Sequence, residues 1–166
     1  MYKINDHVVY GLTGVCQITD IQKDSIDDEE KEYYVLHPVF SDNMTIKIPV
    51  DNVNAKMRKV ISKEEALSLI ATMPDQETAW LKDNRERSEA FKTALKTGKS
   101  EELVKLVRTI YIEKEEMAAI GKKLSKSDEE ILKAAEKQLN EEIAIVLDIP
   151  LDKVVEYIIS HVPTAE

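Results

Sequence analysis

The hydrophobic pattern of the chain changes its period near Val60, and this change limits the folds that the chain can adopt. Before that point, four short segments are rich in β-branched residues and tyrosine and partly alternate apolar with polar positions, as strands do. They are residues 7–10, 15–21, 33–36 and 44–50. After Val60, apolar residues recur at the spacing of helices. Because strands and helices do not alternate along the chain, the sequence predicts an α+β protein with two domains, residues 1–60 and residues 61–166.

The N-terminal domain is predicted to be a small antiparallel β-barrel of the SH3-like or Tudor-like type. Four or five short strands in about sixty residues suit such a barrel, which closes its edges with few residues. Gly11 and Gly14 bracket the first turn, and residues 24–30 are expected to form a polar connection.

The C-terminal domain is predicted to consist of helices only. The expected helix starts are Ser62, Thr78, Ser100, Ser127 and Pro150. Ser62 with Glu65, and Ser127 with Glu130, have the spacing of a capping box. The second helix is expected to carry Trp80 in its first turn and to end at Gly98, which favours a left-handed cap.

The composition is that of a soluble globular protein. Of 166 residues, 43% are hydrophobic and 33% are charged, which is too apolar for a disordered chain and too charged for a membrane protein. The first six residues lack the apolar core of a signal peptide, and one cysteine cannot form an internal disulfide. We therefore expect a cytoplasmic protein that makes no contact with a membrane, and a monomer.

Signatures of enzymes and of metal sites are weak in this sequence. The four glycines do not form a phosphate-binding loop, and the three histidines lack the spacing of metal ligands. Cys16 with His7 or His37 could serve a small hydrolase, as could a carboxylate pair, but a lone cysteine in a strand is usually a buried apolar residue. We expect no catalytic residue, no metal site and no cofactor.

Charge is distributed unevenly along the chain. The formal net charge is -9, which opposes binding to free DNA or RNA. Residues 82–99 are locally basic, with six lysines or arginines against three carboxylates, whereas residues 141–166 carry six carboxylates against one lysine. Contact with nucleic acid is thus expected to be weak and confined to the basic stretch.

Trp80 is the single tryptophan, and two interpretations of it stay open. Its indole could pack the start of the second helix onto the core, as a hydrophobic staple does. Alternatively, Lys82 and Arg85 could point at phosphates on either side of a ring that reaches a base. Spacing alone does not decide between them.

Several segments, in their order along the chain, resemble the CarD family of bacterial transcription regulators, also called CdnL. In the first domain they are residues 6–10 with Gly14 and Val15, residues 32–36 and residues 48–52; in the second they are Trp80, residues 95–99 and residues 123–125 leading to Glu130 and Ala135. Similar first domains occur in transcription-repair coupling factors, but the helical second half argues against a coupling factor.

This resemblance implies a Tudor-like barrel that docks on the β subunit of RNA polymerase, and hence a location at the nucleoid. It also implies a helical domain that touches promoter DNA, weakly and without sequence preference, upstream of the melted region. Trp80 would enter the minor groove at the upstream edge of the bubble, beside the basic residues Lys82 and Arg85. Lys47, and Ile26 in the loop expected before the third strand, would meet the polymerase.

Three departures from the family pattern qualify these expectations. Residues 11–13, Gly-Leu-Thr, stand where the family has proline, a variable residue and histidine, so the turn is expected to differ. Asp24 reverses the charge of a basic polymerase contact, and Asp83 dilutes the basic stretch. The alternative function is an adaptor on RNA polymerase or a repair factor, whose helical domain binds a second protein instead of DNA.

Overall fold

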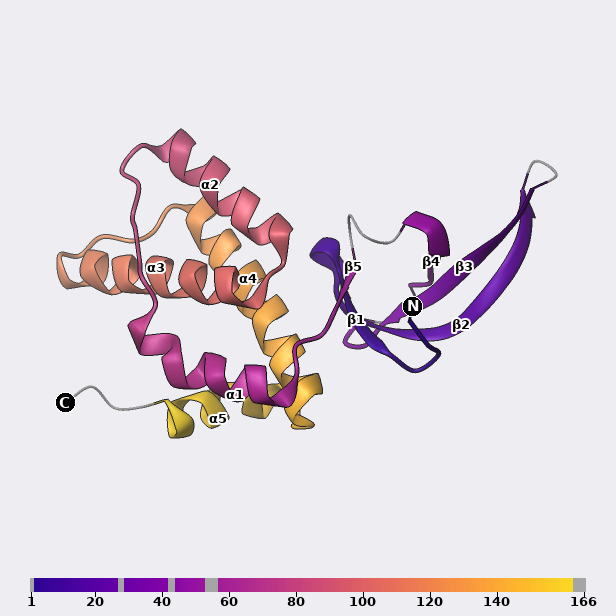
Figure 1. The fold of residues 1–166 in the computed structure, drawn as a ribbon. Helices are drawn as coiled ribbons and strands as arrows, with labels where there is room; N and C mark the ends of the chain where they lie inside the picture. The colour runs from indigo at the N-terminus through magenta and orange to yellow at the C-terminus, as the bar shows by residue number, and fades with distance from the viewer. Residues whose placement is uncertain (1, 27–28, 42–43, 53–56, 163–166) are drawn as a thin grey trace. The chain divides into compact units, whose positions relative to one another are not determined.

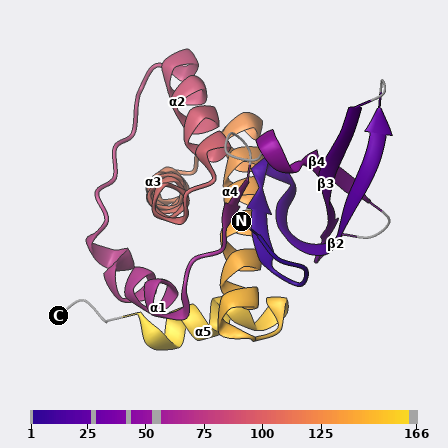
Figure 2. The ribbon, with the colours of Figure 1, turned by 45° about the vertical axis from the view of Figure 1, so that its right-hand side comes forward.

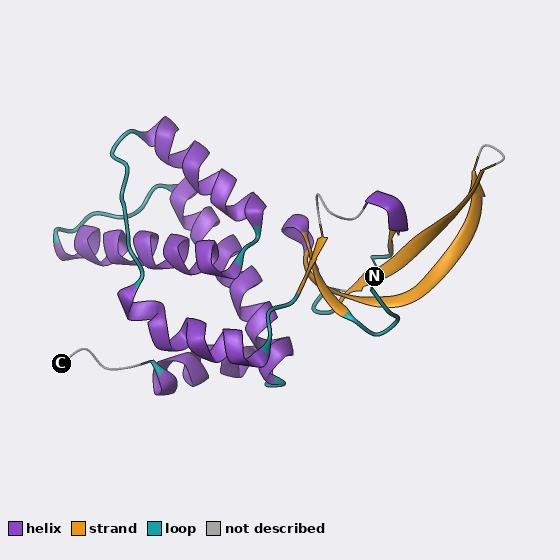
Figure 3. Ribbon diagram, viewed as in Figure 1, coloured by secondary structure: helices purple, strands orange, loops and turns teal. Residues whose placement is uncertain are grey.

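The structure is a computed structural model that describes residues 2–26, 29–41, 44–52 and 57–162 (Figure 1). The chain divides into two compact units, residues 1–60 and residues 61–166. All described strands lie in the first unit, and all described α-helices lie in the second (Figure 3). Among the described helices, none combines the length and the apolar character that a membrane crossing requires.

The described residues of the first unit form one antiparallel sheet of five strands. The strands are β1 (His7–Tyr10), β2 (Gly14–Ile26), β3 (Glu29–Pro38), β4 (Ile46–Pro49) and β5 (Met57–Lys59), arranged in the order β4-β3-β2-β1-β5. β2 and β3 are the long strands and both are curved (Figure 1). The small antiparallel sheet confirms the fold class expected from the strand spacing.

The hairpin of β2 and β3 is longer than the sequence predicted. The prediction of a polar connection over residues 24–30 is wrong, because β2 continues to Ile26 and β3 begins at Glu29. Asp24 pairs with Lys31 across the hairpin. At this end of the hairpin, backbone pairing and facing charges of opposite sign stabilise the strands, and no apolar face reveals them in the sequence.

The core of the first unit contains Cys16. Its side chain is fully buried among residues that include Val8, Ile18 and Leu36, and its thiol donates to the carbonyl of Gly14 over 3.7 Å. This environment is that of a small apolar core residue, the interpretation favoured by the sequence.

The first turn has a backbone conformation that does not suit proline at its first residue. Residues Gly11–Thr13 form a short 3-10 helix, η1, and Gly11 has a φ of 46°. Proline is restricted to φ near -65°, so the proline of the family pattern could not adopt this conformation.

The described part of the second unit, residues 61–162, contains five α-helices packed around an apolar core. They are α1 (Lys63–Thr72), α2 (Asn84–Thr97), α3 (Ser100–Ala119), α4 (Lys126–Leu147) and α5 (Val154–His161), with short 3-10 helices at η3 (Met73–Asp75) and η4 (Leu151–Lys153). Figure 2 views α3 nearly along its axis, with α1, α2 and α4 around it. Leu103 and Ile110 of α3 and Ile143 of α4 are almost completely buried in this core.

Of the five predicted helix starts, two are confirmed and two are wrong. At the fifth, Pro150 precedes the short helix η4, and α5 follows from Val154. The capping box of Ser62 and Glu65 is confirmed, and so is the helix that begins at Ser100. The second helix does not begin near Thr78: it begins at Asn84, because Asp83 accepts a hydrogen bond from the Glu86 amide over 2.9 Å and is the better cap. The fourth begins at Lys126 with Ser125 as its cap, not at Ser127.

Candidate functional site

Trp80 lies in the segment of residues 76–83 that joins η3 to α2, and not in a helical turn as expected. Its side chain is partly buried. The indole lies 5.9 Å from the ring of Phe91 at an interplanar angle of 58°, and the guanidinium carbon of Arg87 lies 4.3 Å from the indole centroid. The ring is therefore packed against α2 on part of its surface and accessible on the rest, so it has features of both interpretations.

Arg87 holds the segment that follows Trp80. Its Nη1 donates to the carbonyl oxygens of Leu81 and Lys82 over 2.9 and 3.4 Å, and its Nη2 donates to Asn84 Oδ1 over 2.8 Å. The arginine itself is only 6% exposed. The Arg87 side chain thus fixes the backbone of Leu81 and Lys82, which makes no helical hydrogen bonds, to α2.

Asp128 neutralises this buried arginine from the first turn of α4. Its two carboxylate oxygens accept from Nε and Nη2 of Arg87 over 3.3 and 2.9 Å, a bidentate pair. The carboxylate also accepts from Ser125 Oγ over 2.9 Å, and the same hydroxyl accepts from the Asp128 amide over 3.1 Å. The start of α4 is therefore linked to the segment that carries Trp80.

The burial of Arg87 lowers the basic charge available to a partner. Arg87 is one of the six cations in residues 82–99. Because Arg87 is buried and paired, only five cations of this stretch remain to balance its three carboxylates. Sequence reasoning missed the pair because its two members lie 41 positions apart and no motif connects them.

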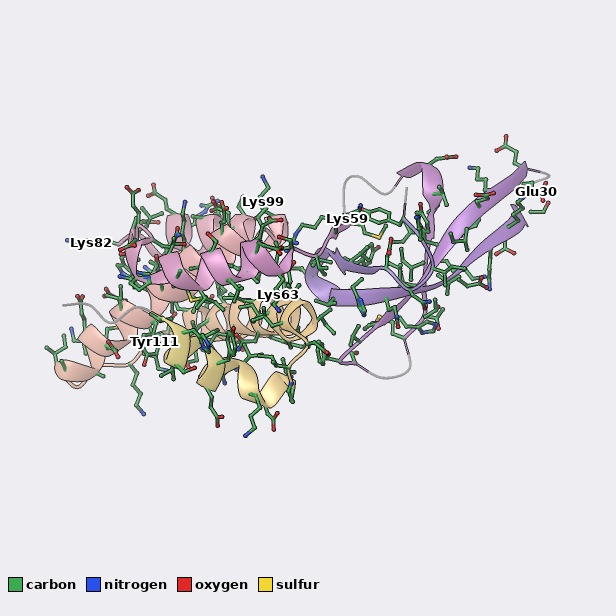
Figure 4. All side chains as sticks on the ribbon, turned by 60° about the horizontal axis from the view of Figure 1, so that its bottom comes forward. Glu30, Lys59, Lys63, Lys82, Lys99 and Tyr111 are labelled. Carbon is green, nitrogen blue, oxygen red and sulfur yellow. The ribbon has the colours of Figure 1, made fainter. Side chains whose placement is uncertain are left out.

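Lys82 and Arg85 are both exposed at the start of α2. Figure 4 labels Lys82 and Lys99, which lie near opposite ends of α2 with side chains directed away from the helices. Arg85 Nε is 3.6 Å from Glu89 Oε1, and both side chains are highly exposed, at 89% and 72%. Such a pair is weak, so Arg85 stays available to an anion. Trp80, Lys82 and Arg85 thus lie within one short segment of the chain, the indole partly buried and the two cations exposed.

In the first unit, Lys47 of β4 and Asp24 of β2 form an ion pair. Lys47 Nζ is 3.1 Å from Asp24 Oδ2, and the two side chains are 47% and 46% exposed. Ile26 is the last residue of β2, paired with Glu29, and does not lie in a loop as expected. The two charged positions that the resemblance connects with polymerase therefore lie together on one surface of the sheet.

Groups suited to catalysis or metal binding are scattered in the described part of the chain. No set of three histidine, cysteine or carboxylate side chains there could hold a metal ion. Burial raises the pKa of the Glu136 carboxyl above its usual value, while the charge of Lys114 lowers that pKa to a smaller extent and the charge of Glu129 raises it further. That carboxyl lies on α4, where no histidine or cysteine accompanies it in the groove that it lines.

The comparison with known families gives two matches. The family model described as CarD-like/TRCF RID domain matches residues 2–61, and the model described as CarD, C-terminal domain, matches residues 68–159. The chain belongs to the CarD family. Its first unit therefore has the Tudor-like fold of the RID domain, and the family is one of transcription factors without enzymatic activity.

A relative in Bacillus subtilis (strain 168) matches almost the full length of both chains. It carries the name "Putative transcription factor YdeB" and is 26% identical over 150 residues, which are 90% of this chain and 94% of the relative. The match spans both units, as the two CarD-family matches do. Together they support a regulator of transcription.

Proposed function

We propose that this CarD-family protein regulates the initiation of transcription by stabilising the promoter open complex. Residues 1–60 bind the β subunit of RNA polymerase, and the helical unit holds promoter DNA through Trp80, Lys82 and Arg85. Trp80 enters the minor groove at the upstream edge of the bubble and slows its collapse. The protein has no catalytic role in this process.

The observation that carries the proposal is the setting of Trp80. The indole is partly accessible, is packed from one side by Arg87, and is followed by exposed Lys82 and Arg85 within five residues. A flat apolar side chain inserted at a base step, with cations beside it for the phosphates, is how many minor-groove proteins hold distorted DNA.

Charge supports a tethered mode of binding to DNA. A protein of net charge -9 with few exposed cations near Trp80 gains little from counterion release, so it binds free DNA poorly. Binding to polymerase through the first unit places the helical unit near promoter DNA at an effective concentration on the order of millimolar. Weak contacts that do not depend on sequence are then sufficient.

For the polymerase contact we propose the surface that carries Lys47 and Asp24, together with Ile26 at the end of β2. Lys47 and Asp24 are about half exposed and lie 3.1 Å apart. A partner surface with a carboxylate opposite Lys47 and a cation opposite Asp24 would complement this pair.

The test is the lifetime of the open complex formed by the cognate polymerase at a ribosomal promoter. We compare no addition, the wild-type protein, Trp80→Ala and Tyr111→Ala, the last being an exposed aromatic residue of α3 that serves as the matched control. The wild type and Tyr111→Ala are expected to prolong the lifetime by about five- to a hundredfold, the effect of one stacking contact. Trp80→Ala is expected to lose this effect while still binding polymerase. Retention of the effect by Trp80→Ala would contradict the proposal.

An apolar groove favours the adaptor as a second candidate function. It has a volume of about 300 Å³ between α3, α4 and α5, and its lining includes Tyr111, Val155 and Ile159, which are 50%, 55% and 73% exposed. Exposed apolar surface of this kind often marks a protein contact. If the wild type binds polymerase but leaves the lifetime unchanged, the adaptor becomes the better explanation.

A further inference from the structure

We propose that Arg87 and Asp128 are positioning residues that hold the Trp80 indole in the orientation required for insertion into DNA. The inference rests on the proposed function of Trp80 and extends it to two residues that contact no DNA themselves. It assigns a role to the buried ion pair beyond the stability of the helical unit.

The hydrogen bonds of Arg87 exclude it from the set of phosphate-binding cations. All three guanidinium nitrogens donate to protein oxygens: Nε to Asp128, Nη1 to the carbonyls of Leu81 and Lys82, and Nη2 to Asn84 and Asp128. The side chain is 8% exposed and that of Asp128 is 5% exposed. Although it lies in the basic stretch, Arg87 has neither the access nor the free donors to bind a phosphate.

The same side chain restricts the indole in two ways. The guanidinium carbon lies 4.3 Å from the indole centroid, so Arg87 covers one face of the ring. Its bonds to the carbonyls of Leu81 and Lys82 fix the backbone directly after Trp80. Only the face and edge of the ring that Arg87 leaves open can reach a base step.

Such restriction strengthens the binding of a wedge. A tryptophan that is already held in place loses less conformational entropy on insertion than one that rotates freely. The backbone around Trp80 makes no helical hydrogen bonds, so its orientation depends on contacts of side chains. The linked pair of Arg87 and Asp128 supplies these contacts from α2 and α4, two elements of the core.

Lysine cannot replace Arg87 in this role. A guanidinium is planar, stacks on an aromatic face and directs several donors at once, whereas an ammonium is a compact charge without a flat face. Arg87→Lys keeps the charge beside Asp128 but removes the stacking and most of the bonds to the backbone. It thus separates the positioning of Trp80 from the simple neutralisation of Asp128.

The experiment measures the lifetime of the open complex with four variants and the mobility of the indole in the three that keep Trp80. Trp80 is the only tryptophan, so its fluorescence anisotropy and its quenching by acrylamide report on this site alone. The variants are Arg87→Lys, Asn84→Ala, Trp80→Ala and Leu139→Ala. Leu139 is a buried residue of α4 that lies outside the hydrogen-bond set of Arg87, so its variant controls for lost stability.

We expect Arg87→Lys to lower the anisotropy of Trp80, to raise its quenching, and to lose at least roughly half of the lifetime extension. Asn84→Ala removes one bond of the arginine at an exposed position and is expected to show the same changes to a smaller degree. If Arg87→Lys fails to fold, Asn84→Ala still tests whether the bonds of Arg87 restrict Trp80. Leu139→Ala is expected to reduce thermal stability without changing either signal at a temperature where it is folded.

The outcomes separate this inference from the proposed function. If Trp80→Ala loses the extension while folded Arg87→Lys and Asn84→Ala behave as wild type, the positioning role is wrong and the proposed function stands. If Leu139→Ala mobilises Trp80 as much as Arg87→Lys does, the pair serves stability only and the inference is again overturned. If Trp80→Ala keeps the full extension, the proposed function fails and the positioning role in DNA binding fails with it.

Discussion

The helical unit and the β-rich unit each contain an ion pair between residues far apart in the sequence, but the pairs differ in burial. The side chains of Arg87 and Asp128 are 8% and 5% exposed, whereas those of Lys47 and Asp24 are 47% and 46% exposed. The buried arginine makes four further hydrogen bonds or ring contacts besides its bonds to the aspartate. Among the contacts described, the lysine side chain of the exposed pair bonds to its aspartate alone.

This difference indicates different uses of the same chemistry. Water is excluded from the buried pair, so the surrounding protein fixes its geometry. The pair in turn holds Trp80 in one orientation. The exposed pair is solvated and can exchange its partner for a charge on another protein at little cost.

Arg87→Ala is expected to have the largest effect on stability. It leaves the Asp128 carboxylate buried without its cation, and breaking a buried pair in this way costs about 3–5 kcal/mol. Urea unfolding followed by helical circular dichroism measures the loss. Arg85→Ala on the same helix is the control, because Arg85 is exposed and its removal is expected to leave the free energy of unfolding near the wild-type value. If Arg87→Ala and Arg85→Ala lower the free energy of unfolding by similar amounts, the buried pair does not stabilise the protein more than an exposed charge does.

The double variant Arg87→Met with Asp128→Leu removes both charges together. Replacing a buried ion pair by apolar residues of similar size is often close to neutral for stability, so the helical unit is expected to unfold within about 2 kcal/mol of the wild type. The stacking on Trp80 and the bonds to the backbone are nevertheless lost. The lifetime of the open complex is therefore expected to shorten although stability is largely kept. If the double variant is stable and prolongs the lifetime of the open complex as the wild type does, the pair serves the fold alone.

Signals that depend on neighbouring residues predicted more of this structure than could be inferred about contacts between residues far apart in the sequence. The capping box of Ser62 and the left-handed glycine at Gly98 depend on neighbouring residues, and both are confirmed. The apolar pattern continues through Trp80 and predicts a helix there, but Asp83 caps α2 more effectively than Thr78 would. Competition between two local signals is hard to resolve without knowledge of the packing.

The candidate site was only partly predictable for a different reason. Trp80, Lys82 and Arg85 are near one another in the sequence, so the sequence alone places them in one segment. The pairs of Arg87 with Asp128 and of Lys47 with Asp24 span 41 and 23 positions and depend on tertiary structure. Charge counts along the chain treat each residue as solvated, and for Arg87 this assumption is wrong.

Lys47→Ala tests the exposed pair as a polymerase contact. The variant is expected to weaken binding to the polymerase β subunit by roughly fivefold, the effect of one partly exposed charge at an interface. Lys59→Ala is the matched control, because Lys59 is an exposed lysine on β5, at the opposite edge of the sheet from β4. Titration calorimetry with the β subunit measures both. Equal weakening by the two variants would indicate a general charge effect and not a contact at β4.

The smallest expected effect is the coupling between Asp24 and Lys47 in the free protein. A double-mutant cycle of Asp24→Asn and Lys47→Met is expected to give a coupling of at most about 0.5 kcal/mol at low salt, since exposed pairs lose most of their attraction to solvation and side-chain entropy. In 1 M salt the Debye length falls to about 3 Å, so the coupling is expected to vanish. A coupling that exceeds 1 kcal/mol, or that persists in high salt, would mean that the sheet holds this pair as rigidly as α2 and α4 hold theirs. Asp24 would then be unable to release Lys47 to a partner, and the polymerase contact would have to lie elsewhere on the first unit.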